Sequence, residues 1–187
     1  MTRRDFLLKT GAALLGLAGL AEIGEAAPMI KKTYLSFNGY DPRPSTDFIV
    51  IHHTGLSVDK DSTAAQIHGL HRDLKDWAGI GYHYLIRKDG TIEQGRAPEL
   101  MGAHTYGHNR NSVGICLAGN YELAEPPEKQ FLAAKELVAW LGQKYKLKLR
   151  LGETVLGHCD LNRTDCPGKY LYRRLPELAG GSGKIMA

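Results

Sequence analysis

The sequence predicts one α/β domain, with a central mixed β-sheet flanked by helices. Short apolar runs at residues 47–53 and 113–118 are typical of strands that are buried on both faces of a sheet. Residues 63–77 and 128–145 instead carry apolar side chains at helical spacing. Because predicted strands and helices alternate along the chain, we expect them to pack around one core. A length of 187 residues suits a single domain.

The first predicted helix follows an irregular arm. Residues 28–46 carry three prolines and little periodicity, which indicates an extended N-terminal arm. Thr63 and Gln66 match a capping box, in which each side chain bonds the other residue's backbone N–H. The helix over 63–77 is therefore expected to begin at Thr63.

The remaining predicted elements are a hairpin, a second long helix and a short C-terminal end. Asp89-Gly90 marks a tight turn between strands at 81–87 and 91–94. A double proline before residue 128 suits the start of a helix. We expect the chain to finish with a strand, a short helix and a flexible tail, at residues 154–158, 169–175 and 179–187.

The N-terminus resembles a twin-arginine export signal. Arg3-Arg4 precedes Lys9 and an apolar stretch at residues 11–20, which is too short to span a bilayer comfortably. Small residues near the end of this segment offer a cleavage point. We therefore expect residues 1–27 to be an export signal, a periplasmic or secreted domain, and no stable membrane anchor after cleavage. The alternative is an uncleaved membrane anchor.

The net charge and the cysteine content give limited evidence on the class of protein. The formal charge of +4 fits attraction to an acidic polymer such as a cell wall, and equally fits many soluble proteins. No cluster of Lys and Arg and no aromatic-basic motif indicates nucleic-acid binding. The three cysteines are an odd number, which argues against a pure disulfide framework in an oxidising compartment. At least one thiol therefore needs another role.

Three residues offer a set of metal ligands. His52 and His158 lie at the ends of predicted strands, and Cys166 lies in the loop after the second strand. Neutral imidazole and thiolate are good zinc donors, and catalytic zinc sites usually take three protein ligands and leave a fourth position for water. The alternative from spacing alone is that these histidines, among eight in the chain, are structural.

Six short motifs run in order along the chain. They are Phe-Ile-Val-Ile-His-His-Thr at 48–54, Gly-Tyr-His-Tyr-Leu-Ile at 81–86, Asp-Gly-Thr-Ile-Glu-Gln-Gly-Arg at 89–96, Gly-Ala-His at 102–104, Asn-Ser-Val-Gly-Ile-Cys-Leu-Ala-Gly at 111–119, and Gly-His with Thr-Asp-Cys-Pro-Gly within 157–168. Together they resemble the N-acetylmuramoyl-L-alanine amidase family, which includes bacteriophage lysozyme-type amidases and animal peptidoglycan recognition proteins. The resemblance covers about residues 46–176 and implies a zinc amidase domain of that fold at 47–178.

The resemblance implies a role for each matching residue. His52, His158 and Cys166 fall on the three zinc ligands, and Tyr82 falls on the catalytic tyrosine. Thr164 occupies a catalytic position that is lysine in the phage enzymes and threonine in catalytic recognition proteins. With threonine there, transition-state stabilisation would depend more on zinc and Tyr82.

Two further residues are expected in the substrate groove. The resemblance places His104 in a cleft-forming loop, where it is expected to bind substrate or shuttle a proton, and Asn109 lies nearby. Other candidates are more often structural. His53 and His83 alternate to the faces opposite His52 and Tyr82, and the remaining structural candidates are His68, His71, Trp77, Cys116 and Cys159. Cys116 lies where a related branch carries a catalytic glutamate, and Cys159 is expected either to pair with Cys116 or to stay free.

The resemblance implies a zinc-dependent N-acetylmuramoyl-L-alanine amidase, with one Zn²⁺ per chain. Such an enzyme hydrolyses the amide bond between the lactyl group of N-acetylmuramic acid and L-alanine in bacterial peptidoglycan. The partner would be peptidoglycan or a muropeptide, and the chain is expected to be a monomer. The alternatives are a non-catalytic peptidoglycan-binding module and a purely structural zinc site, which would need a fourth protein ligand.

Overall fold

A mixed β-sheet forms the centre of the fold in the computed structural model, which describes residues 26–181. The strands lie in the order β1-β4-β3-β5-β2-β6. Neighbouring strands pair in parallel except for the antiparallel hairpin of β3 and β4. The strand bounds are Ile30–Lys31 (β1), Phe48–His53 (β2), Tyr84–Ile86 (β3), Ile92–Gln94 (β4), Ser112–Leu117 (β5) and Val155–Gly157 (β6). The predicted α/β class with a mixed sheet is confirmed.

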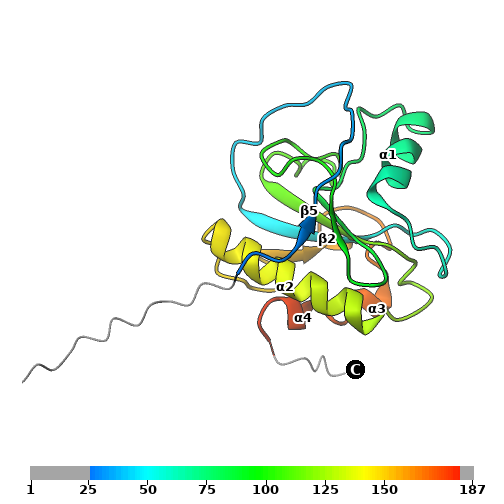
Figure 1. The fold of residues 1–187 in the computed structure, drawn as a ribbon. Coiled ribbons are helices and arrows are strands. Elements are labelled where there is room, and N and C mark those ends of the chain that lie inside the picture. Colours follow the sequence, from blue (N-terminus) through cyan, green and yellow to red (C-terminus); the bar gives the residue numbers. More distant parts are fainter. Residues whose placement is uncertain (1–25, 182–187) are drawn as a thin grey trace, which may run out of the picture.

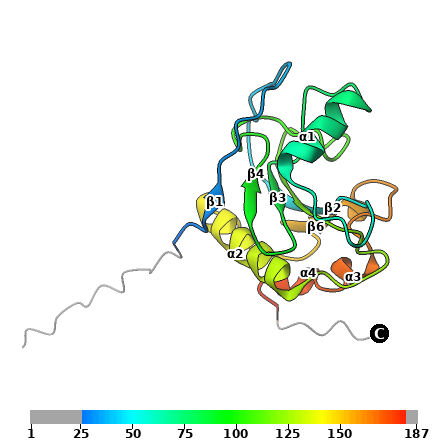
Figure 2. The same cartoon turned by 45° about the vertical axis from the view of Figure 1, so that its right-hand side comes forward.

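Helices cover both faces of this sheet (Figures 1 and 2). Helix α1 (Ala64–Asp73) lies on one face, and α2 (Glu128–Lys144) lies on the other with the short α3 (Lys169–Tyr172) and α4 (Leu175–Leu178). The larger apolar cluster joins α2 and α4 to the sheet, and a smaller one joins α1 to the opposite face. Among residues 26–181, no helix is long and apolar enough to cross a membrane.

The two-residue period of strand β2 separates its side chains between these faces. Ile49 and Ile51 are fully buried in the cluster below α2. His52, one residue further, therefore faces the α1 side, and His53 faces the α2 side again. This alternation places one histidine at each face of the same strand end.

Helix α1 begins as predicted and ends earlier. Thr63 is the N-cap, and its reciprocal bonds with Gln66 form the expected capping box. The helix ends at Asp73 rather than at residue 77, because Asp76 adopts a left-handed conformation with φ of 52° and turns the chain away. The N–H of Trp77 then bonds the carbonyl of His71.

The helix predicted at residues 169–175 ends earlier, and a second short helix follows it. Pro176 has no N–H to donate to the carbonyl of Tyr172, so a continuous helix would lose a bond there. The chain instead ends α3 at Tyr172 and starts α4 at Leu175, with Pro176 in the first turn.

The N-terminal arm is docked on the domain. Ile30–Lys31 pairs with β4 as an edge strand, which was not predicted from the sequence. Further along, Leu35 and Phe37 pack against the apolar cluster below α1, and the carbonyl of Asp41 accepts a bond from the N–H of Met101. Residues 1–25 and 182–187 are outside the described part of the chain, so the predicted export signal and most of the tail are not described.

Candidate metal centre

Three potential ligands meet at the carboxyl edge of the sheet. His52 lies near the end of β2, and His158 begins a 3-10 turn directly after β6. Because β2 and β6 are neighbouring parallel strands, their ends lie at the same edge. One ligand atom each from His52, His158 and Cys166 lies within 4.8 Å of the others. The structure thus brings together the three residues that the sequence proposed as ligands.

The loop after β6 carries Cys166 back to β2. The backbone N–H of His53 donates to Cys166 Sγ at 3.4 Å. Thr164 Oγ1 accepts a bond from the Cys166 N–H at 3.2 Å, and the N–H of Cys159 bonds the Cys166 carbonyl at 2.8 Å. These contacts fix the loop so that Sγ lies 3.6 Å from His52 Nδ1.

Both ligand histidines use Nε2 for a second contact. His52 Nε2 lies 3.1 Å from His104 Nδ1, and His158 Nε2 lies 3.1 Å from Asn162 Oδ1. Such contacts fix the orientation of a metal-binding imidazole. His52 Nδ1 then faces Cys166 Sγ, and Nδ1 of His158 is the ring nitrogen that Asn162 does not engage. Asn162 was not predicted from the sequence, where its only signal is its position four residues after His158.

The protonation states suit metal binding by the two imidazoles. Burial, reinforced by His158, holds the pKa of His52 well below its ordinary value of 6.5. Burial also lowers the pKa of His158, while the bond to Asn162 opposes this shift. Burial raises the pKa of the Cys166 thiol to about 12. At neutral pH both rings are therefore neutral, and a bound cation would have to displace the thiol proton.

The Tyr82 side chain lies beside the ligands. Its ring centroid is 5.1 Å from that of His52. The backbone before it is held close to the next loop, since a Cβ on Gly81 would come within 2.1 Å of the Ala103 carbonyl oxygen. Burial raises the pKa of the Tyr82 phenol well above its ordinary value, and the thiols of Cys116 and Cys166 add to the shift. The phenol therefore keeps its proton at neutral pH.

A rigid loop supports His104. Asn109 Oδ1 accepts bonds from the backbone N–H groups of His104 and Thr105, at 2.8 and 3.0 Å. The imidazole packs directly on two glycines, since a Cβ at Gly102 or Gly114 would come within 2.4 or 2.6 Å of the ring. The Asn109 oxygen is thus already occupied by the backbone, and the predicted substrate contact of Asn109 stays a prediction.

Four other histidines stabilise the backbone. Each accepts a backbone N–H at Nδ1, and the pairs are His53 with Tyr121, His68 with Ile80, His71 with Gly81, and His83 with Gly114. The structural role predicted for these residues agrees with these bonds. The three cysteines are free, so Cys116 and Cys159 are not paired, and Cys116 is fully buried.

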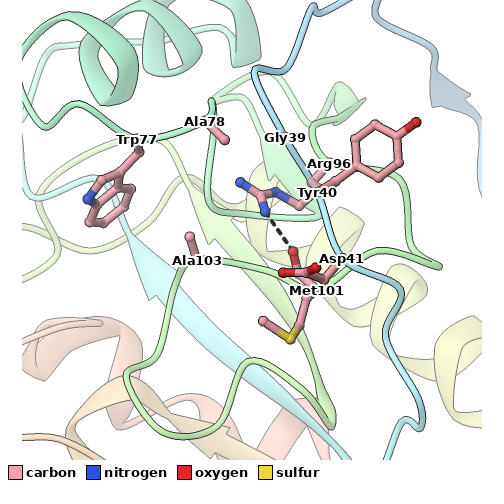
Figure 3. Close-up of a pocket in the computed structure, with 8 residues that line it drawn as sticks. All are labelled: Gly39, Tyr40, Asp41, Trp77, Ala78, Arg96, Met101 and Ala103. Atoms are coloured by element: carbon pink, nitrogen blue, oxygen red, sulfur yellow. Dashed lines mark hydrogen bonds between the residues drawn. The ribbon is translucent and has the colours of Figure 1, made fainter.

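A groove begins at the ligands and continues past Trp77. A cavity of about 380 Å³ is lined by side chains that include Trp77, His104, Asn109 and His158. Trp77 and Ala103 also line a second cavity of about 490 Å³ (Figure 3). Trp77 is 38% exposed, so its helical spacing did not indicate a core position. It forms a wall that the two cavities share.

A family model described as N-acetylmuramoyl-L-alanine amidase matches residues 41–169. The chain belongs to this family. It is 32% identical over 135 residues to an endolysin of Klebsiella phage KP32, which covers 72% of this chain and 88% of the endolysin. It is 34% identical over 132 residues to the human N-acetylmuramoyl-L-alanine amidase, where the match covers 67% of this chain and only 23% of the relative.

Solved structures of family members share the fold. The amidase LysC from Clostridium intestinale superposes with a TM-score of 0.73 at 29% identity, covering 83% of this chain and 99% of LysC. Drosophila PGRP-LB superposes with a TM-score of 0.72 at 25% identity, covering 85% of this chain and 99% of that protein. A tyrosine-to-phenylalanine variant of PGRP-LB was solved in complex with tracheal cytotoxin. The family thus includes proteins named as amidases and proteins named for peptidoglycan recognition.

Proposed function

We propose that this chain is a zinc-dependent amidase that hydrolyses the bond between the lactyl group of N-acetylmuramic acid and L-alanine in peptidoglycan. The observation that carries the proposal is the convergence of His52, His158 and Cys166 beside the protonated phenol of Tyr82. A metal site next to a hydrogen-bond donor is the arrangement that amide hydrolysis needs.

The donor set fits zinc. Two imidazole nitrogens and one sulfur within 4.8 Å of one another can reach a single ion at the usual zinc–ligand distances of about 2.0–2.3 Å. His52 and His158 would hold it through Nδ1, and Cys166 through Sγ. Bound zinc supplies a water of lowered pKa and polarises the scissile carbonyl.

Tyr82 and Thr164 would act on the substrate side of this site. The Tyr82 phenol can donate a hydrogen bond to the carbonyl oxygen as that oxygen gains negative charge, because the phenol stays protonated at neutral pH. Thr164 already accepts the N–H of Cys166, and this bond leaves its hydroxyl proton free to be donated. Thr164 thereby holds Cys166 in place and offers a second donor.

Two observations favour catalysis over the alternatives. In the described part of the chain, the metal-binding group contains three residues and no fourth ligand, which suits a catalytic site better than a structural one. The cavity lined by His104 and His158 begins at the ligands, so a substrate in it would lie next to the metal. A module that only binds peptidoglycan needs no such open coordination position.

The proposal includes a cellular location. The Arg3-Arg4 motif and the apolar stretch after it support export by the twin-arginine route to the periplasm or beyond. Peptidoglycan lies in that compartment, so the substrate would be accessible there. We further propose that the chain acts as a monomer on wall or muropeptide fragments.

Mass spectrometry of peptidoglycan fragments tests the activity directly. Purified fragments are incubated with the protein, with and without a zinc chelator. We expect chelator-sensitive release of intact stem peptides that carry a free L-alanine amino group. Absence of cleavage by protein that is shown to contain zinc would contradict the amidase and favour a recognition module.

A further inference from the structure

A cavity between β1 and α2 lies apart from the metal site. It holds about 420 Å³, and the side chains that line it include Lys32, Tyr84, Gln94, Glu99, Trp140 and Lys144. Figure 2 shows β1 and α2 side by side. Tyr84 belongs to the apolar cluster below α2, whereas Leu85, the next residue of β3, belongs to the cluster below α1. Because His52 faces the α1 side, the cavity lies against the opposite face of the sheet.

A second cavity continues from the first along the end of α2. It holds about 290 Å³, and both cavities are lined by Pro98, Glu99 and Lys144. Arg43 and Tyr145 lie at its far side, where the guanidinium carbon of Arg43 is 5.4 Å from the centroid of the Tyr145 ring. Neither cavity shares a lining residue with the two cavities that share Trp77. A ligand with several units can therefore extend from one cavity into the other without reaching the metal groove.

The Tyr84 hydroxyl has no partner within the fold. The residue is 1% exposed, and in the described part of the chain its hydroxyl makes no hydrogen bond. The oxygen is not among the fully enclosed polar atoms without a partner, so it opens to the cavity that Tyr84 lines. Burial raises the pKa of the phenol above its ordinary value, and Tyr145 and Glu99 add to the shift. The hydroxyl therefore stays protonated and can both donate and accept a hydrogen bond.

The uncharged groups lie deepest in this cavity. Tyr84 is buried, and Gln94 and Trp140 are half-buried, whereas Glu99 and Lys144 are exposed. Within residues 26–181, the side chains of Gln94 and Glu99 form no hydrogen bond and no ion pair. The Gln94 amide offers both a donor and an acceptor. Since a buried polar group needs a partner, the interior suits an uncharged ligand whose groups both donate and accept.

Trp140 adds an apolar wall beside these polar groups. Its side chain packs against the larger apolar cluster, and Ile30 and Pro98 extend the apolar surface around it. Lys144 Nζ lies 5.0 Å from the centroid of the Trp140 ring, at the exposed side of the wall. A pyranose ring has the same division, because its C–H groups can pack on an aromatic side chain while its hydroxyls project from the edge. The lining therefore matches the chemistry of a sugar.

We propose that this cavity binds a pyranose unit of a glycan strand, with C–H groups against Trp140 and a hydroxyl bonded to the Tyr84 hydroxyl. The Gln94 amide bonds a second polar group of the same unit. The site goes beyond the proposed amidase function, since it contains no candidate metal ligand and does not depend on cleavage. A glycan strand bound here would hold the domain on the wall polymer while the metal site faces a different part of the polymer.

The two tryptophans of the chain provide a direct test, because Trp77 lines the metal groove and Trp140 lines this cavity. Trp77→Phe leaves Trp140 as the single indole fluorophore. The zinc-loaded variant is titrated with the linear tetramer of N-acetylglucosamine, which has no lactyl group and no peptide. We expect a saturable change in Trp140 emission. No change at millimolar tetramer, or a change only in Trp140→Phe, which retains Trp77, would overturn the proposal.

A single hydroxyl then assigns the contact. Tyr84→Phe in the Trp77→Phe background removes only the hydroxyl, and we expect affinity for the tetramer to fall by about 3- to 10-fold, the usual effect of losing one hydrogen bond. The unfolding midpoint should not fall, because no group of the fold loses a partner. Tyr34→Phe, at a fully exposed tyrosine outside the cavity, is the matched control and should leave affinity unchanged. Unchanged affinity in Tyr84→Phe would overturn the placement of the sugar.

Two further probes test the chemical class of the ligand. Tetraalanine and inorganic phosphate are titrated into Trp77→Phe over the same concentration range, and neither should give a saturable change in Trp140 emission. If either binds as tightly as the tetramer, the cavity is not a saccharide site. None of the three probes contains a bond that the proposed amidase would cut. The result is therefore independent of whether peptidoglycan fragments are cleaved.

Discussion

Two groups of histidines in this domain differ in how they use Nδ1. The candidate ligand histidines, His52 and His158, bond through Nε2 to His104 and Asn162, and His52 Nδ1 faces Cys166 Sγ. The backbone-bonding histidines accept a backbone N–H at Nδ1, and they are His53, His68, His71 and His83. The residue type is the same, and the partner of Nδ1 distinguishes the two candidate zinc ligands from the four histidines that support the backbone.

The comparison is clearest between His52 and His53, which are consecutive on β2. The alternation of the strand sends His52 to the α1 face and His53 to the α2 face. His53 meets the Tyr121 N–H at 3.0 Å, whereas His52 meets Cys166 and His158. Neighbouring positions in the sequence therefore do not imply the same role. The role of each histidine depends on which face of β2 its side chain occupies.

Loss of a ligand histidine should have the largest effect. We expect His52→Ala to lower zinc affinity by more than about 100-fold, because removing a ligand should cost more than removing one of its supporting residues. Chelator competition measures the affinity. His68→Asn, at one of the backbone-bonding histidines, should lower the stability of the protein, and the variant should still bind zinc. A folded His68→Asn variant that loses zinc would break the distinction between the two groups.

Replacing Tyr82 separates chemistry from metal binding. We expect Tyr82→Phe to lower kcat by about 100- to 1000-fold, the usual cost of losing one donor to a developing oxyanion. Zinc content should not change, since His52, His158 and Cys166 are the candidate ligands and the Tyr82 phenol keeps its proton at neutral pH. Steady-state kinetics and metal analysis of the same preparation provide the check, and loss of zinc would show that Tyr82 is structural.

The residues behind the ligands should have a smaller effect on the metal. His104→Ala and Asn162→Ala each remove the partner of an Nε2 atom, and we expect zinc affinity to fall by about 10- to 100-fold. His104→Asn should restore part of the loss, because its side chain can place a hydrogen-bonding atom near the position of Nδ1. Wild-type zinc affinity in His104→Ala would mean that His104 does not position His52.

The backbone-bonding histidine His83 should make the stability of the protein depend on pH. Burial lowers the pKa of His83 from 6.5 to about 3. Between these values the unfolded chain binds a proton that the folded chain does not, so stability is complete above pH 6.5 and falls as the pH drops toward 3. The slope for one such group is at most about 1.4 kcal/mol per pH unit.

Urea unfolding of chelator-treated protein at pH 7 and pH 5 measures this effect. The His83→Asn variant should be less stable than the wild type at pH 7, because it loses a bond to the Leu100 carbonyl. It should also lose less stability on acidification. An equal acid-induced loss in both proteins would assign the pH dependence to other groups.

Local sequence signals predicted the sheet and the start of α1, and family motifs predicted which ligands would meet. The capping box at Thr63 and the apolar run of β2 depend on neighbours in the chain, so they could be read directly. The partners of the ligand histidines depend on tertiary contacts. Asn162 approaches His158 only after the loop folds, and His104 is 52 residues from His52. Neither contact leaves a periodic pattern.

The same reason explains the errors at element ends and in the arm. The helix was predicted to reach Trp77 because the apolar spacing continues, but the left-handed Asp76 ends that pattern in space. The arm carries three prolines and little periodicity, so it shows no strand pattern, and β1 forms because β4 offers an edge to pair with. The apolar spacing within α1 and α2 is visible in the sequence, whereas the end of α1 and the pairing of β1 depend on the rest of the fold.

Because the N-terminal arm packs on the domain away from the candidate metal ligands, one wall of the groove and the metal site can be altered independently. The family model matches the chain from Asp41 onward, and Gly39 and Tyr40, which precede that match, line the cavity of about 490 Å³ with Arg96 (Figure 3). None of the three metal-binding residues precedes Asp41. Grafting a different arm onto the same sheet would therefore exchange one wall of the groove and leave the metal edge untouched. The arm is therefore a place where the shape of the groove can be changed by mutation without changing the candidate metal ligands.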